Sequence, residues 1–174
     1  MTRYQQGFNP YTGPVALPKN ERVESAKAEF VANSEKVTAA KPFPRIVDLW
    51  STGLRLAIAE DLDPIPYVDE KRRNFHDNVG TLIAGDIPLM ALIATVSVRH
   101  GYRYESKSFE DAIAILDQPR EQIRVADVYA HAGVEKLLDV VSVHKSAPGP
   151  ALTRYFQKLE IASQPHLEPA ESGL

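Results

Sequence analysis

The sequence predicts an all-α fold, a single helical bundle with a central apolar helix and flexible termini. Apolar residues occupy most positions of the stretch 120–144 at helical spacing, and its polar residues fall into a narrow stripe. No segment alternates apolar and polar residues over enough positions to predict a strand. Because a helix with so little polar surface must be covered on most sides, we expect residues 120–144 at the centre of the bundle.

Composition limits the classes of function. The net charge of -3 does not describe a protein that coats nucleic acid or an anionic membrane through its overall field. No apolar run reaches the ~20 residues that cross a bilayer, and the N-terminus lacks the hydrophobic core of a signal peptide, so we expect a cytoplasmic protein without a membrane partner. The absence of cysteine excludes disulfides, a thiolate nucleophile and cysteine-based metal sites.

The chain divides into a flexible arm (1–19), a helical domain (20–160) and a flexible tail (161–174). Prolines and glycines are dense enough in the arm to predict that it contains no regular element. The arm is either a disordered tail or a segment that docks its aromatic side chains on a partner or a neighbouring subunit and orders there. The residues that would carry this contact are Tyr4, Phe8 and Tyr11.

The first half of the domain predicts two helices. The first runs from Asn20 to about Lys36 with one apolar edge. The second starts with Pro44 in its first turn and continues to about Asp61. The highly charged residues 67–78 then predict a solvated connection, and residues 79–84 fit either a short helix or a strand.

The second half predicts four more helices. Asp86 is placed to cap a helix that continues to His100 and ends at Gly101. Ser108 with Asp111 predicts the cap of a short helix over 109–116. After the central helix, residues 146–151 predict a linker, and a last amphipathic helix follows.

Gly133 indicates how the central helix packs. In an exposed helix interior it would cost about 1 kcal/mol relative to alanine. Its position beside Ala126, Ala130 and Ala132 therefore predicts that another helix approaches closely there. The residues expected in one core are Trp50, Leu54, Leu92, Val96, Tyr129, Val134 and Leu137.

Few residue patterns indicate catalysis or metal binding. Asp127, His131 and Glu135 share one helix face, but no second ligand-bearing segment completes a site, so a solvated stripe with i,i+4 pairing is favoured. His76-Asp77 is only a dipeptide. Phosphate loops, dinucleotide fingerprints and His-Glu-x-x-His motifs are absent. The sequence therefore predicts no enzyme, no catalytic residues, no cofactor and no metal, with a metal-dependent hydrolase using His76, Asp77 and His131 as an alternative.

The first alternative, ahead of the hydrolase, is nucleic-acid binding. Basic and aromatic residues interleave at the end of one predicted helix, where they could meet phosphates and stack on bases. These candidates are Arg99, Tyr102, Arg103, Tyr104 and Lys107. Basic residues at a helix C-terminus also suit the macrodipole, which requires no ligand.

Two segments carry a resemblance to a known family. Residues 42–62 read PFPRIVDLWSTGLRLAIAEDL and residues 124–141 read RVADVYAHAGVEKLLDVV. They resemble the small helical accessory proteins of bacterial DNA phosphorothioation (Dnd-type) and related phage-defence systems. The resemblance implies a non-catalytic accessory or adaptor subunit of a defence or DNA-processing complex. Such a subunit acts by contacts with a larger nuclease, ATPase or modification enzyme, and the sequence leaves open direct contact with DNA and a homodimer.

Overall fold

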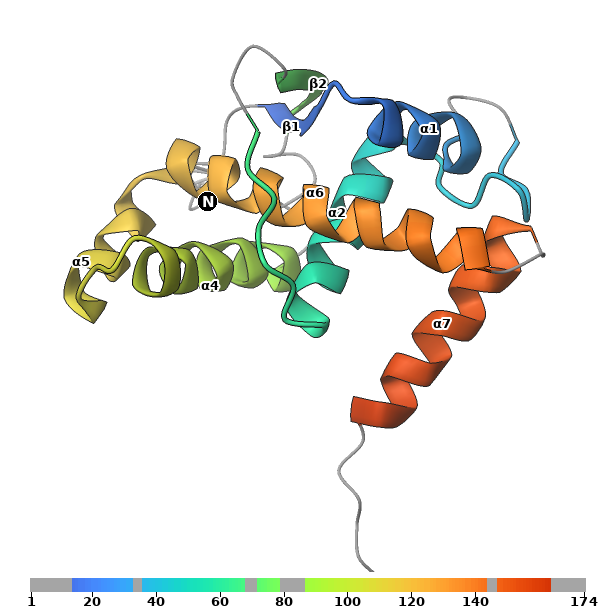
Figure 1. Ribbon diagram of the computed structural model, residues 1–174. Helices are drawn as coiled ribbons and strands as arrows, with labels where there is room; N and C mark the ends of the chain where they lie inside the picture. The colour runs from blue at the N-terminus through green and yellow to red at the C-terminus, as the bar shows by residue number, and fades with distance from the viewer. Residues whose placement is uncertain (1–13, 33–35, 68–71, 79–86, 144–146, 164–174) are drawn as a thin grey trace, which may run out of the picture.

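The computed structural model describes residues 14–32, 36–67, 72–78, 87–143 and 147–163 (Figure 1). This part of the chain is mainly helical, so the predicted all-α class is confirmed. Its elements are β1 (Pro14–Pro18), α1 (Glu21–Phe30), α2 (Ile46–Ala59), β2 (Arg72–Asn78), α4 (Ile87–Tyr104), α5 (Phe109–Ile113), the 3₁₀ helix η2 (Ala114–Asp117), α6 (Pro119–Val143) and α7 (Pro148–Ser163).

The long helix α6 contacts most of the other elements. It packs on α1, α2, α4, α7 and β1, and Figure 1 shows it crossing the width of the molecule. The predicted core residues are all buried except Leu92, which is half-buried. Trp50 and Tyr129 are fully buried in this core and contribute large aromatic surfaces to it.

Helices α2 and α6 touch through their backbones. A Cβ atom on Gly133 would lie 1.8 Å from the carbonyl oxygen of Gly53. A Cβ atom on Gly53 would lie 2.6 Å from the carbonyl oxygen of Ala130. The predicted close approach at Gly133 is confirmed, and its partner is a second glycine.

Strands β1 and β2 pair antiparallel, with Ala16 opposite Asn74. Two predictions are therefore wrong: residues 14–18 form a regular element inside the presumed arm, and residues 72–78 form a strand inside the presumed solvated connection. Tertiary contacts decide this outcome. The residues 15–17 are fully buried, and the Ala16 amide donates a hydrogen bond to Asp127 of α6 at 2.9 Å.

Several helices differ from their predicted lengths. Helix α1 ends at Phe30 because the next residue, Val31, forms a β-bridge with Phe43. The Phe43 amide donates to the Phe30 carbonyl at 3.0 Å. Helix α2 begins at Ile46, where the Asp48 carboxylate accepts the Arg45 amide at 3.0 Å. Helix α7 begins at Pro148, inside the predicted linker.

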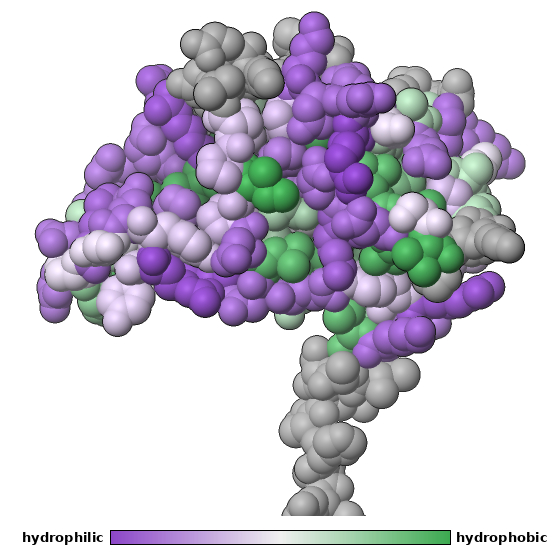
Figure 2. Space-filling model, in the orientation of Figure 1, coloured by the Kyte–Doolittle hydropathy of each residue, from purple (hydrophilic) through white to green (hydrophobic). Residues whose placement is uncertain are grey.

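Helix α4 does not stop at Gly101 but continues to Tyr104. Gly101 serves packing instead: a Cβ atom there would lie 3.3 Å from the Ala112 Cβ of α5. Over the described ranges, no helix has the length and apolar character that a membrane span requires. On the face of the molecule seen in Figure 2, hydrophobic residues gather in separate small patches among hydrophilic ones.

Candidate functional site

An open apolar groove lies between α4 and the α5–η2 segment. It has a volume of about 720 Å³, which falls within the range of roughly 300–1,000 Å³ typical of ligand-binding clefts. Thr95, Val98 and Tyr102 of α4 form one wall, and Phe109, Ile113 and Leu116 form the other. We call this feature the α4–α5 groove.

Local sequence explains why α5 returns alongside α4. The Ser108 hydroxyl accepts the Asp111 amide at 3.1 Å and donates to the Asp111 carboxylate at 2.8 Å, so the predicted cap is confirmed. The missing side chain at Gly101 then lets Ala112 approach α4. These two features hold Phe109 at the start of α5, where its side chain remains 59% exposed.

Exposed apolar side chains distinguish the groove from an ordinary surface. Tyr102, Phe109, Ile113 and Leu116 are all exposed, although each is large and apolar enough to favour burial. Single exposed hydrophobic residues need no explanation, but a contiguous group around a groove is typical of a binding surface. The groove is therefore the strongest candidate site in the described part of the chain.

Asp61 forms ion pairs with two arginines at one edge of the groove. It pairs with Arg99 at 2.5 Å and with Arg103 at 2.9 Å, two residues one turn apart on α4. The hydrogen bond to Asp61 raises the pKa of Arg103. Because the groove surface is almost entirely apolar, the aliphatic stems of the two arginines contribute to its lining while their guanidinium groups meet Asp61.

The end of α2 positions Asp61. Its φ of 52° lies in the left-handed region, where aspartate is tolerated better than most residues. The Leu62 amide donates to the Ala57 carbonyl at 2.8 Å, and the Asp61 amide donates to the Ile58 carbonyl at 3.3 Å. This is the Schellman arrangement, with aspartate at the position that usually carries glycine.

Aromatic residues surround the two arginines on the interior side. The Arg99 guanidinium lies 5.7 Å from the centre of the Tyr129 ring, within the range of a cation–π contact. His100 stacks on Tyr104 and meets Tyr129 edge-on. Burial lowers the pKa of His100 and raises the pKa of Tyr129 to about 12.

The structure places three of the five residues predicted to bind nucleic acid in the groove and the other two outside its lining. Arg99, Tyr102 and Arg103 line the groove. Tyr104 donates its hydroxyl to Asp63 at 2.5 Å, which raises the tyrosine pKa, and Lys107 pairs with Glu105 at 2.6 Å. Each of the four polar or basic side chains other than Tyr102 is thus matched with an acid.

Sequence reasoning missed the second wall of the groove and the acids behind its edge. Phe109, Ile113 and Leu116 recur at i, i+4 and i+7, a helical spacing that indicates one apolar face on this short segment. This spacing could have predicted the apolar face from the sequence, but it could not have predicted that the face stays exposed. The predicted partner-binding residues Tyr4, Phe8 and Tyr11 lie outside the described residues, as do the side chains of His76 and Asp77.

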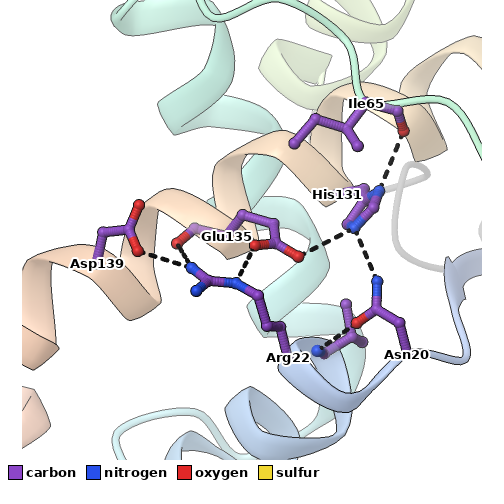
Figure 3. A network of polar contacts seen from close by, with 7 residues as sticks. Asn20, Arg22, Ile65, His131, Glu135 and Asp139 are labelled. Atoms are coloured by element: carbon purple, nitrogen blue, oxygen red, sulfur yellow. Dashed lines mark hydrogen bonds and ion pairs between the residues drawn. The ribbon is translucent and has the colours of Figure 1, made fainter.

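The predicted polar stripe of α6 contributes to a second cluster, and Figure 3 shows its residues His131, Glu135 and Asp139. The prediction that it is solvated is wrong for Asp127 and His131, which are 1% and 4% exposed. The i,i+4 pairing is confirmed for His131 and Glu135, at 3.3 Å. Glu135 also pairs with Arg22 of α1, which reaches Asp139 at 2.7 Å (Figure 3).

His131 ties two distant segments to α6. Its Nδ1 lies 3.1 Å from the Ile65 carbonyl oxygen, and its Nε2 lies 3.2 Å from the side-chain nitrogen of Asn20 (Figure 3). Asn20 also caps α1, because its side-chain oxygen accepts the Val23 amide at 2.8 Å. The Ile65 amide in turn donates to the Val128 carbonyl at 3.2 Å, so this cluster fastens the chain before α1 and after α2.

The α6 cluster does not assemble metal ligands. Asp127 accepts hydrogen bonds from the Trp50 indole at 3.0 Å and from Ala16, whereas His131 binds Ile65 and Asn20. Across the described ranges, no three histidine or carboxylate side chains gather as a metal site would require. The partners of each residue indicate a structural role.

No family model, curated protein or solved structure matches this chain.

Proposed function

We propose that this protein is a non-catalytic adaptor subunit that binds a larger protein through the α4–α5 groove. The observation that carries the proposal is the gathering of Tyr102, Phe109, Ile113 and Leu116 as exposed residues around one apolar groove. Burying such a group against a partner gives a favourable free energy, at roughly 25 cal/mol per Å² of apolar surface. A hydrophobic core of this kind is typical of the centre of a protein interface.

The setting of the adaptor comes from the sequence resemblance. Residues 42–62 and 124–141 resemble the accessory proteins of DNA phosphorothioation and phage-defence systems, so the proposed partner is a nuclease, ATPase or modification enzyme of such a complex. In the structure these segments form α2 and most of α6, which pack against each other. The resembling segments therefore serve as the scaffold, and the groove is built beside them.

Affinity purification from native cells tests the adaptor function. The full-length protein should recover a larger enzyme in stoichiometric amount, and Phe109→Glu should abolish the recovery. Phe109 is exposed at the first turn of α5, where a carboxylate suits the helix dipole, so the variant should stay folded. Met90→Glu is the matched control, because Met90 is an exposed apolar residue in the first turn of α4 and does not line the groove.

The outcomes separate groove binding from other modes. Recovery with wild type and Met90→Glu, but not with Phe109→Glu, supports the proposal. Recovery with all three proteins places the contact elsewhere. A wild-type protein that is purified without a partner contradicts the adaptor function.

Nucleic-acid binding is the second candidate, and one observation favours it. Arg99, Tyr102 and Arg103 line the same groove, so cationic and aromatic groups are adjacent. Against it, Asp61 already pairs with both arginines, and Glu105 pairs with Lys107. The Asp61 carboxylate offsets one of the two arginine charges, and few positive charges then remain to attract a phosphate backbone, because counterion release depends on the number of positive charges brought to it.

A further inference from the structure

The walls of the α4–α5 groove restrict the backbone of its occupant. Both walls consist of side chains on helices, whose backbone groups are engaged in helical hydrogen bonds. A peptide that binds as an added β-strand needs an exposed sheet edge to satisfy its amides and carbonyls, and this groove has none among its lining residues. A helix satisfies its own backbone and presents only side chains, as in helix-in-groove recognition.

The charge at the groove edge restricts the side chains of the occupant. Arg99 and Arg103 contribute two guanidinium groups, and Asp61 offers them a single carboxylate. None of the described residues that line the groove is aspartate or glutamate. The guanidinium donors that Asp61 does not engage are therefore complementary to a carboxylate on the occupant.

Arg103 is the residue best placed to meet such a carboxylate. Its side chain is 43% exposed, whereas that of Arg99 is 24% exposed and lies over Tyr129. Its planar guanidinium has donors left after it meets one oxygen of Asp61. A second carboxylate can thus bind Arg103 without displacing Asp61.

From these constraints we infer that the α4–α5 groove binds an acidic amphipathic helix of the partner protein. The helix buries apolar side chains at i, i+3, i+4 and i+7 between α4 and α5, and an aspartate or glutamate beside them binds Arg103. This inference rests on the proposed adaptor function and specifies the chemistry of its partner.

Two synthetic amphipathic peptides test the inference. They share one apolar face of leucine and phenylalanine, and the residues flanking that face are glutamate in one peptide and lysine in the other. Titration against the full-length protein should give an affinity for the acidic peptide about three- to tenfold higher than the affinity for the basic peptide. Arg103→Gln, which keeps an aliphatic stem, should weaken binding of the acidic peptide about two- to fivefold and leave binding of the basic peptide unchanged.

Matched controls separate charge at the groove from charge elsewhere. Arg124→Gln removes an exposed arginine of α6 that pairs with Glu121, outside the groove, and should leave both affinities unchanged. Phe109→Glu should weaken the binding of both peptides. A chemical-shift or cross-linking readout should place the bound peptide against Thr95 and Ile113.

Each contrary outcome has a defined meaning. Equal affinities for the two peptides, or no effect of Arg103→Gln, overturn the inference while leaving groove-dependent recovery of a partner intact. Failure of both peptides to bind, with stoichiometric binding of decanoate, shows that the groove takes an acyl chain and also overturns it. A groove blocked by self-association, measured by sedimentation and relieved by Phe109→Glu, makes a second copy the occupant. A wild-type protein that recovers no partner refutes the adaptor function itself.

Discussion

Gly53 and Gly133 bring helices α2 and α6 into backbone contact, because a Cβ atom on Gly133 would lie within 2.7 Å of three backbone atoms of Gly53. We expect Gly133→Ala to lower the free energy of unfolding by about 1–3 kcal/mol, since a backbone cannot yield as a flexible side chain can. Urea denaturation measures this change. A variant as stable as the parent protein would mean that the two helices do not cross at these residues.

The control for this prediction is Gly101→Ala in α4. Its added Cβ atom would meet the Ala112 Cβ at 3.3 Å, a tight contact with a side chain on a short helix. The gain in helix propensity, about 1 kcal/mol, opposes this contact. We therefore expect Gly101→Ala to change stability by less than Gly133→Ala.

The buried pair of Trp50 and Asp127 gives a second prediction. Trp50→Phe should destabilise the fold by about 1–3 kcal/mol, because Asp127 loses one of the donors that satisfy its buried carboxylate. Asp127→Ala should cost more, since it leaves both the Trp50 indole and the Ala16 amide without this acceptor. Urea denaturation of the single variants and the double variant should give a coupling energy of about 0.5–3 kcal/mol. Strictly additive losses would contradict a direct interaction.

The same pair shows how far the sequence predicts the fold. The course of α6 follows from residues close together in sequence: the apolar periodicity over 120–144 predicts a helix within one residue of the observed Pro119–Val143. The burial of Asp127 follows from β1, a strand more than a hundred residues away. An aspartate inside a helical pattern appears solvated until its distant donors are known.

The candidate site likewise combines features that the sequence predicts with features that depend on tertiary contacts. The cap at Ser108 and the basic residues of α4 are local features and are readable from the sequence. The packing role of Gly101 depends on the approach of Ala112, and the pairing of Asp61 with Arg99 and Arg103 depends on how α2 ends beside α4. These are contacts between separate elements, and periodicity carries no information about them.

His100 predicts a dependence of stability on pH. Burial lowers its pKa below the ordinary value of 6.5, with Glu105 opposing and Lys107 reinforcing the shift. Between the lowered pKa and 6.5 the unfolded state binds more protons than the folded state, so stability falls as pH drops below about 6.5 and is fully present above it. His100→Phe retains a ring beside Tyr104 and removes the titration.

The measurement is the difference in unfolding free energy between wild type and His100→Phe as a function of pH. We expect the difference to be constant above about pH 7 and to move against the wild type as pH falls below the ordinary pKa of histidine. Other titrating groups affect both proteins and cancel in the difference. A difference that is flat across the whole range would show that His100 is solvated.

Asp61 provides the prediction that separates the adaptor from a nucleic-acid binder. Asp61→Asn keeps a residue that tolerates the left-handed backbone and removes the charge that pairs with Arg99 and Arg103. We expect wild type to bind single-stranded DNA only in the nonspecific range, with a Kd of roughly 10⁻⁴–10⁻⁶ M at physiological salt, and Asp61→Asn to bind severalfold tighter with a steeper salt dependence. Fluorescence anisotropy at several salt concentrations measures both. If wild type instead binds tightly, and Arg99→Ala with Arg103→Ala abolishes that binding, Asp61 does not neutralise the site and nucleic-acid binding replaces the adaptor function.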